Sequence, residues 1–178
     1  MQSKTFIWLT AFFLAACQNK PTAQELQECP IDVHFSPKGG VTQSIVAGIK
    51  DSSSDIRIQA FSFTSRPIAD ALIEAKKSGK NVEAILDREN LGNKSSVMQS
   101  LYDNGITIYI DKSHAIAHNK VIIIDGQKVF TGSFNFSKGA EESNAENSLL
   151  ISNKRISDLY MENWTLHKDH SHLFSPEN

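Results

Sequence analysis

The sequence predicts one α/β domain built on a mixed β-sheet with helices on both faces. Strand-like and helix-like apolar patterns alternate in the order βαβαβαβ over residues 30–110, which favours a sheet with crossover helices. The length of 178 residues suits a single domain with a sizeable core. No internal repeat marks a second domain, and a content of 40% apolar and 21% charged residues is typical of a globular protein.

The first half of the chain supplies the alternating elements. Residues 30–37 alternate apolar and polar side chains between two prolines, as a strand does. The next expected helix follows Gly40 and carries one apolar stripe of Val41, Ile45 and Ile49. The other elements expected here are strands at 56–63, 81–86 and 106–110 and helices at 67–79 and 95–103.

The second half predicts a β-hairpin, a further strand and a C-terminal helix. Residues 118–125 form a strand-like run rich in β-branched residues, Asp125-Gly126 is a strong hairpin turn, and residues 128–130 return. A strand is expected at 147–151. The final helix is indicated by an apolar stripe of Ile156, Leu159, Tyr160 and Trp164.

The hairpin, residues 118–135, reads HNKVIIIDGQKVFTGSFN and carries the candidate chemistry. Side chains alternate faces along a strand, so His118 and Lys120 point the same way. The returning strand brings Ser133 back beside His118, and Asn135, two residues further on, shares the face of Ser133. Ser133 and Asn135 thus offer a hydroxyl and an amide to whatever group His118 and Lys120 hold.

The spacing His-x-Lys-x4-Asp, followed by Gly-Ser-x-Asn, resembles the HKD motif of the phospholipase D superfamily. The matching residues are His118, Lys120, Asp125, Gly132, Ser133 and Asn135. The flanking sequence resembles the small bacterial endonuclease branch of that superfamily over about residues 29–168. This implies a phospholipase D-like sandwich, and it places Glu146 where that branch has a carboxylate that hydrogen-bonds the catalytic histidine.

The resemblance also implies a mechanism and an oligomer. Superfamily members need two HKD motifs facing each other, and this chain has one, so a homodimer with the active site at its interface is expected. His118 would form a covalent phosphohistidine, and Lys120, Ser133 and Asn135 would bind the phosphate. No metal and no cofactor takes part in this scheme. Asp125 faces away from His118 on an unbroken strand, so we expect its carboxylate to hold the turn.

The N-terminus predicts export and lipidation. Residues 1–16 have a basic start and a short apolar run, as in a cleaved signal peptide. Leu14-Ala15-Ala16-Cys17 resembles the bacterial lipobox, with ordinary cleavage nearby as the alternative, so Cys17 is the expected lipidation site. Residues 17–28 then form a polar tether, residues 29–172 the nuclease-like domain and residues 173–178 a tail.

Net charge does not favour nucleic-acid binding by itself, because the formal charge is −2. Any phosphate binding must therefore come from a local cluster of basic side chains. Arg88 and Lys94 lie in a loop after an expected strand, and Arg66 follows another, so these side chains are candidate nucleic-acid contacts. A solvated loop with surface charges explains each of them equally well.

The other histidines do not predict a metal site. His114 stands four residues before His118, which would suit a metal pair on a helix, but the surrounding residues predict strand or loop. We expect His167, His170 and His172 to form a solvated helix end.

These observations predict a metal-independent phosphodiesterase, most simply a non-specific DNA endonuclease, with RNA left open as a second nucleic-acid substrate. A phospholipase D or phosphatidyl transferase acting on membrane phospholipids is the alternative, and a catalytically inactive binding or scaffold lipoprotein is the third. The expected location is the bacterial cell envelope, with lipid anchorage facing the periplasm or in the outer membrane; a secreted or soluble periplasmic protein is the alternative.

Overall fold

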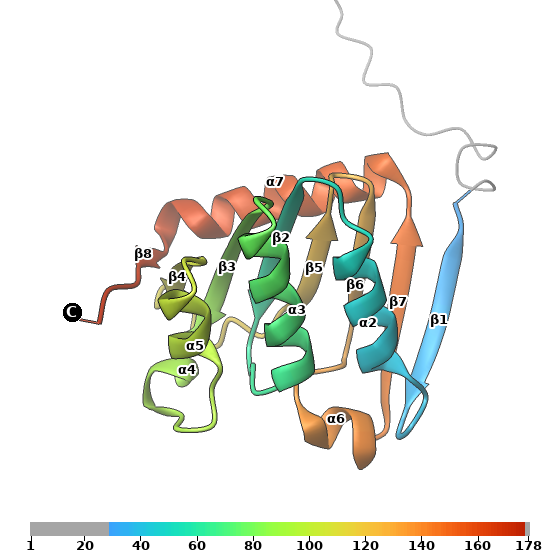
Figure 1. Cartoon of the computed structure of the whole chain (residues 1–178), viewed down its shortest axis with the longest axis horizontal. Coiled ribbons are helices and arrows are strands. Elements are labelled where there is room, and N and C mark those ends of the chain that lie inside the picture. Colours follow the sequence, from blue (N-terminus) through green and yellow to red (C-terminus); the bar gives the residue numbers. More distant parts are fainter. Residues whose placement is uncertain (1–28, 177–178) are drawn as a thin grey trace, which may run out of the picture.

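The computed structural model describes residues 29–176 and shows one mixed sheet with strand order β1-β7-β6-β5-β2-β3-β4-β8 (Figure 1). β2, β3 and β4 run parallel, and every other neighbouring pair is antiparallel. The strands are β1 (Ile31–Ser36), β2 (Asp55–Ala60), β3 (Asn81–Asp87), β4 (Thr107–Asp111), β5 (Lys120–Ile124), β6 (Lys128–Gly132), β7 (Glu146–Ser152) and β8 (His172–Leu173).

Helices cover both faces of this sheet, which confirms the predicted α/β sandwich. The helices are α2 (Val41–Lys50), α3 (Arg66–Lys77), α4 (Glu89–Gly92), α5 (Met98–Asp103), α6 (Lys138–Glu142) and α7 (Lys154–His170). Figure 1 shows α2, α3 and α5 on one face and α7 crossing the other.

The core is divided between the two faces. The larger cluster lies beneath α2 and α3 and includes the predicted stripe of Val41, Ile45 and Ile49, each at most 1% exposed. The smaller cluster lies beneath α7, where buried Trp164 donates its indole N–H to the carbonyl oxygen of Ile58 at 3.0 Å. This bond anchors the C-terminal helix across the central strands.

Several boundaries differ from the prediction. β2 ends at Ala60 rather than at residue 63, and β5 begins at Lys120 rather than at residue 118. Both differences lie at the same end of the sheet, where Ala60 of β2 pairs with Lys120 of β5 beside the candidate site. The segment expected as a tail begins inside the sheet, because β8 pairs with β4 and the backbone N–H of Phe174 donates to Ile108 at 2.8 Å.

The N-terminal predictions, including Cys17, concern residues outside the described range. Within residues 29–176, no helix is both long enough and apolar enough to cross a bilayer.

Candidate active site

The motif residues other than Asp125 meet at one end of the central strands of the sheet. β5 starts there with Lys120, β6 ends there with Gly132, and β7 starts there with Glu146. Gly132 pairs with Ser148 of β7 at a φ of 150°, and a Cβ atom at this position would collide with the carbonyl group of Asn147. Only glycine therefore allows β6 and β7 to approach this closely beside the site.

His118 and Lys120 are held together by Phe61. The imidazole of exposed His118 packs on the Phe61 ring with centroids 4.6 Å apart. The Lys120 Nζ lies 5.1 Å from the same ring and donates to the carbonyl oxygen of His118 at 2.6 Å. His118 precedes β5 instead of lying on it, so these contacts, and not strand alternation, bring the imidazole and the ammonium together.

Lys120 is an almost buried cation, 6% exposed. Burial lowers the pKa of its ammonium, and the carboxylates of Glu146 and Glu89 offset part of that effect. A cation that is already stripped of water interacts strongly with any anion that enters the site.

Glu146 contacts Ser133 and not His118. Its Oε2 accepts the Ser133 hydroxyl at 2.6 Å, and its Oε1 accepts the Asn144 side-chain amide at 3.1 Å. Among the described residues, the His118 ring has no hydrogen bond. The expected hydrogen bond from Glu146 to His118 is therefore not found within the chain, and the carboxylate instead orients the hydroxyl predicted to bind phosphate.

Asn135 offers an unused polar atom. Its Oδ1 is buried and has no hydrogen-bond partner within residues 29–176. The flanking Phe134 and Phe136 are each 2% exposed and pack in the core, which fixes the backbone on both sides of Asn135. Because the backbone at Asn135 is fixed, its side-chain amide can bind a ligand with little further loss of conformational freedom.

The loop before His118 is fixed by residues that follow β3. The buried carboxylate of Asp87 accepts the backbone N–H of Ala117 at 2.7 Å, and the Arg88 guanidinium donates to the carbonyl oxygen of Ala115 at 2.9 Å. Arg88, predicted as a nucleic-acid contact, thus has a structural partner. Asp87 and Arg88 together determine where the chain enters the site.

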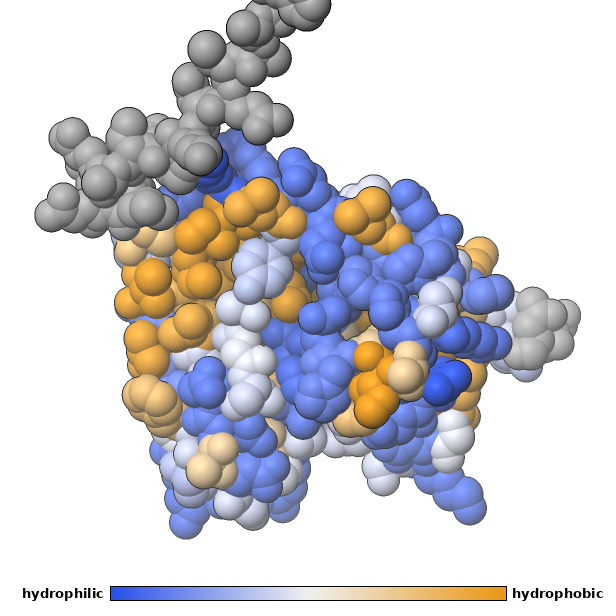
Figure 2. Space-filling model, turned by 180° about the vertical axis from the view of Figure 1, so that it is seen from behind, coloured by the Kyte–Doolittle hydropathy of each residue, from blue (hydrophilic) through white to orange (hydrophobic). Residues whose placement is uncertain are grey.

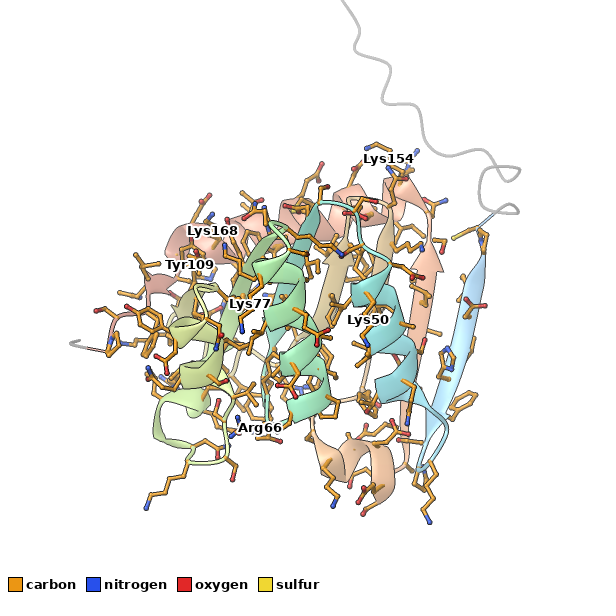
Figure 3. The ribbon with its side chains drawn as sticks, in the orientation of Figure 1. Lys50, Arg66, Lys77, Tyr109, Lys154 and Lys168 are labelled. Carbon is orange, nitrogen blue, oxygen red and sulfur yellow. The ribbon has the colours of Figure 1, made fainter. Side chains whose placement is uncertain are left out.

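The other two candidate contacts differ in their relation to the site. The backbone N–H groups of Thr64 and Ser65 donate to the carbonyl oxygen of Phe136, so Arg66 begins α3 close to Asn135. Figure 3 shows Arg66 at the lower end of α3, which lies nearest the same end of the central strands. Lys94 is exposed in the segment between α4 and α5.

Asp125 lies at the far end of β5 from Lys120. Its carboxylate accepts the backbone N–H groups of Ser53 at 2.7 Å and of Ser54 and Asp55 at 2.9 Å each. Burial alone would raise the pKa of this carboxyl, but the hydrogen bonds from Asp55, Ser53 and Ser54 hold it below its usual value. The carboxylate thus fastens the hairpin turn to the segment entering β2, rather than closing its own turn.

Two of the C-terminal histidines do not form a solvated helix end. His167 and His170 turn toward Asp111, the last residue of β4, and His114 approaches it from the following loop. Burial would raise the pKa of the Asp111 carboxyl, yet the hydrogen bonds from these histidines hold it well below its usual range. The expectation that His167 and His170 lie in a solvated helix end is therefore wrong, and the four residues form a group that could hold a metal ion.

Sequence reasoning missed Phe61 and Asp87. Phe61 fell inside an expected strand and gave no signal of its own. Asp87 stands at the carboxyl end of a parallel strand, where ligand crevices form, and that position could have drawn attention to it.

Known proteins are similar to this chain in sequence and in fold. A family described as cardiolipin synthase, PLD-like domain, matches residues 45–165. A protein named phospholipase D from Rickettsia prowazekii is 40% identical over 155 residues, which cover 86% of this chain and 76% of the relative. The crystal structure of Nuc from Salmonella typhimurium, a phospholipase D family member, has a TM-score of 0.78 and 33% identity, covering 83% of this chain and 99% of Nuc. The structure of NucT from Helicobacter pylori has a TM-score of 0.76 and 26% sequence identity, and the match covers 83% of this chain and 100% of NucT.

Proposed function

Because this chain belongs to the phospholipase D superfamily and is a phosphodiesterase of that family, we propose that it is a metal-independent endonuclease acting on DNA without sequence preference. One observation carries the proposal: exposed His118 lies on Phe61 beside the nearly buried Lys120, at the end of the central strands that also presents Ser133. An exposed nucleophile, His118, next to a nearly buried cation, Lys120, suits a long anionic substrate.

In the proposed reaction, Nε2 of His118 attacks phosphorus and forms a phosphohistidine. Lys120, Ser133 and Asn135 stabilise the charge that develops on the non-bridging oxygens. A second imidazole, the partner subunit's His118, gives its proton to the leaving oxygen and then takes one from the water that hydrolyses the intermediate. Glu146 orients the Ser133 hydroxyl, with which it shares a hydrogen bond.

The polymer substrate is favoured by the exposure of the site. His118 and Ser133 are both exposed, and Arg66 starts α3 beside the segment that carries Asn135. Contacts of this kind address phosphate rather than bases, so sequence preference should be low. Long acidic polymers need such a surface, whereas an acyl chain needs an apolar cleft.

A second candidate, phospholipase D activity on membrane lipids, is favoured by one observation. The Rickettsia prowazekii relative, 40% identical over 155 residues, carries that name. The predicted lipid at Cys17 would also hold the domain at a bacterial membrane, which is the location we propose.

The decisive experiment compares both substrates in one buffer. Purified protein is incubated in excess EDTA with supercoiled plasmid, with single-stranded DNA and with phosphatidylglycerol vesicles. We expect DNA cleavage that falls by about a thousandfold or more in His118→Ala and is unchanged in His172→Ala, an exposed histidine on the edge strand β8, which is separated from β5 by three strands.

Other outcomes assign other functions. Hydrolysis of the vesicles without cleavage of DNA would establish the lipid activity. Cleavage that EDTA abolishes at once in protein that stays folded would overturn the metal-independent mechanism. If a folded protein cleaves neither substrate, the scaffold hypothesis replaces both.

We propose that a second copy of the chain completes the site. β1 is an edge strand whose Ile31, Val33 and Phe35 are 49%, 51% and 64% exposed. Figure 2 shows an apolar area at this side of the molecule. Phe35 pairs with Asn147, which neighbours Ser133, so apolar surface reaches the site itself. Exposed apolar surface beside a half-complete site suits a partner subunit.

Introducing a charged residue on β1 tests the proposed dimer. Phe35→Glu should raise the monomer fraction in sedimentation and lower activity in proportion. Leu173→Glu is the matched control, since Leu173 is 63% exposed on β8, at the other edge of the sheet. Full activity from a Phe35→Glu monomer would exclude a site shared between subunits at this edge.

A further inference from the structure

A second cluster of chemically active side chains lies apart from the motif residues. It consists of Asp111 at the end of β4, His114 in the following loop, and His167 and His170 three residues apart on α7. Their candidate ligand atoms all lie within 4.8 Å of one another. None of them belongs to the HKD constellation.

The carboxylate at the centre of this cluster is crowded on one oxygen. Oδ2 of Asp111 lies 2.9 Å from Nδ1 of His114, 3.0 Å from Nδ1 of His167 and 3.3 Å from Nε2 of His170. Its other oxygen, Oδ1, already faces the backbone N–H groups of Ser113 and His114. A carboxylate oxygen has about two lone-pair sites, and three imidazole nitrogens crowd around Oδ2.

We propose that Asp111, His114, His167 and His170 bind one divalent transition-metal ion, with Zn²⁺ the best match. Three imidazoles and one carboxylate are nitrogen and oxygen ligands that Zn²⁺ accepts, and four protein ligands fill a tetrahedral shell. Ligand atoms about 2.0–2.1 Å from Zn²⁺ lie about 3.3 Å from one another in a tetrahedron. The three separations around Oδ2, from 2.9 to 3.3 Å, are close to that edge length.

The surroundings hold the ligands in place before an ion arrives. Asp111 is fully buried, and the side chains of His167, His170 and His114 are 15%, 36% and 45% exposed, so an ion can enter from the solvent side. The backbone donors on Oδ1 of Asp111 are the kind of outer contact that orients a ligating carboxylate.

The helix that carries two of the ligands is also fixed over the sheet. Lys168, next to His167, forms an ion pair with Glu83 at 2.9 Å, and its Nζ lies 4.8 Å from the centre of the Tyr109 ring. Figure 3 shows Lys168 and Tyr109 close together where α7 passes β4. These contacts keep the C-terminal turns of α7 beside Asp111.

The ion would have a structural role. Four protein ligands leave no open position for substrate, as in closed structural zinc sites. It would join α7 to the residues 111–114 that begin the segment leading to His118. The importance of this link for the position of His118 rests on the proposed function, whereas metal binding itself does not.

The test measures Zn²⁺ binding directly. Purified protein without a polyhistidine tag is stripped with EDTA, transferred to chelator-free buffer and titrated with Zn²⁺ by calorimetry, and bound metal is counted after dialysis. We expect one ion per chain. His114→Ala and His170→Ala should each weaken binding by more than the roughly 10- to 100-fold that loss of an outer contact costs.

Matched variants keep the result specific. His172→Ala removes an exposed histidine two residues from His170 and should bind Zn²⁺ as the unaltered protein does. His118→Ala should also bind normally, which separates this proposal from the proposed nuclease activity. Circular dichroism establishes that each variant is folded, and His114→Ala is the least disruptive because its side chain is 45% exposed.

Amide hydrogen exchange provides a second readout. Zn²⁺ should slow exchange over residues 111–117 and over the last turns of α7, and it should leave α2 unaffected. The proposal is overturned if the stripped protein takes up no Zn²⁺, or if folded His114→Ala and His170→Ala bind it as tightly as the His172→Ala control. In that case the cluster is a hydrogen-bonded network only.

Discussion

Replacing Asp125 with Asn is expected to destabilise the fold by about 2 kcal/mol and to leave the chemistry intact. Asp125 is the third member of the HKD signature, yet it lies five residues along β5 from Lys120, or about 16 Å at the rise of a strand. Asn is the matched change, because Asp125 has a φ of 53° and Asn tolerates this left-handed conformation nearly as well.

The magnitude follows from the hydrogen bonds of the carboxylate. Asn keeps an oxygen that can still accept from Ser54 and Asp55, but its amide nitrogen cannot accept from Ser53, which now lies 2.7 Å from Oδ2. A hydrogen bond to a charged group contributes about 1.5–3 kcal/mol and a neutral one about 0.5–1.5. Loss of the Ser53 bond costs about 1.5 kcal/mol, the low end of the charged range, and weakening of the two remaining bonds adds only about 0.5 kcal/mol in total, because Ser53 and Ser54 are exposed and water can replace their partner.

The effect should also depend on pH. The pKa of Asp125 is lower in the folded chain than its ordinary value, so its contribution to stability is present above the unfolded pKa, about 3.9. That contribution is lost as the pH falls through the folded value. The stability difference between the unaltered protein and Asp125→Asn should therefore be largest at pH 7 and shrink below about pH 4.

Thermal unfolding followed by the fluorescence of buried Trp164 measures this difference. At pH 7 we expect a midpoint temperature lower by roughly 4–8 °C, with kcat of the folded variant unchanged. Asp32→Asn is the control, an exposed carboxylate of β1 that makes no side-chain hydrogen bond with the described residues. Equal destabilisation at pH 7 and pH 3.5, or loss of kcat in stable protein, would refute this account.

Three further predictions concern the site and its location. Lys120→Met should lower kcat/KM by about 100- to 1,000-fold. It should not lower the melting temperature, because burial disfavours the charged form of Lys120 in the folded chain, and a lower melting temperature would contradict this. Arg66→Glu should raise KM for long DNA and reduce its logarithmic salt dependence by about one unit, whereas Lys77→Glu, at the other end of α3, should change neither. Cys17→Ser should move the protein from the membrane to the soluble fraction, and continued sedimentation with membranes would exclude lipid anchorage at this residue.

The sequence predicted the sheet and its main helices because their signals are local. The stripe of Val41, Ile45 and Ile49 repeats every four residues and is buried as expected. Asp125-Gly126 lies at the turn of the hairpin, where both residues have positive φ. The two-residue strand β8 carries no such pattern, since its pairing with β4 depends on where α7 ends.

The site was predicted as a set of residues but not as a set of contacts. The spacing of His118 and Lys120 is a local signal, and strand alternation predicts that their side chains point the same way. In the structure β5 begins only at Lys120, and Phe61, the residue that follows β2, brings the two side chains together. Glu146 bonds to Ser133 because β6 and β7 are neighbours in the sheet. Contacts of this kind depend on tertiary packing, which a single sequence does not reveal.

The position of His118 depends on both ends of the loop that precedes it. At its later end, Asp87 binds the backbone of Ala117. At its earlier end, the histidines of α7 converge on Asp111. Among the described residues, the His118 side chain itself makes only a ring contact with Phe61, so its placement is set largely by residues distant in sequence. A change in the Asp111 cluster should therefore alter the geometry of attack more than the binding of substrate, and lower kcat more than it raises KM.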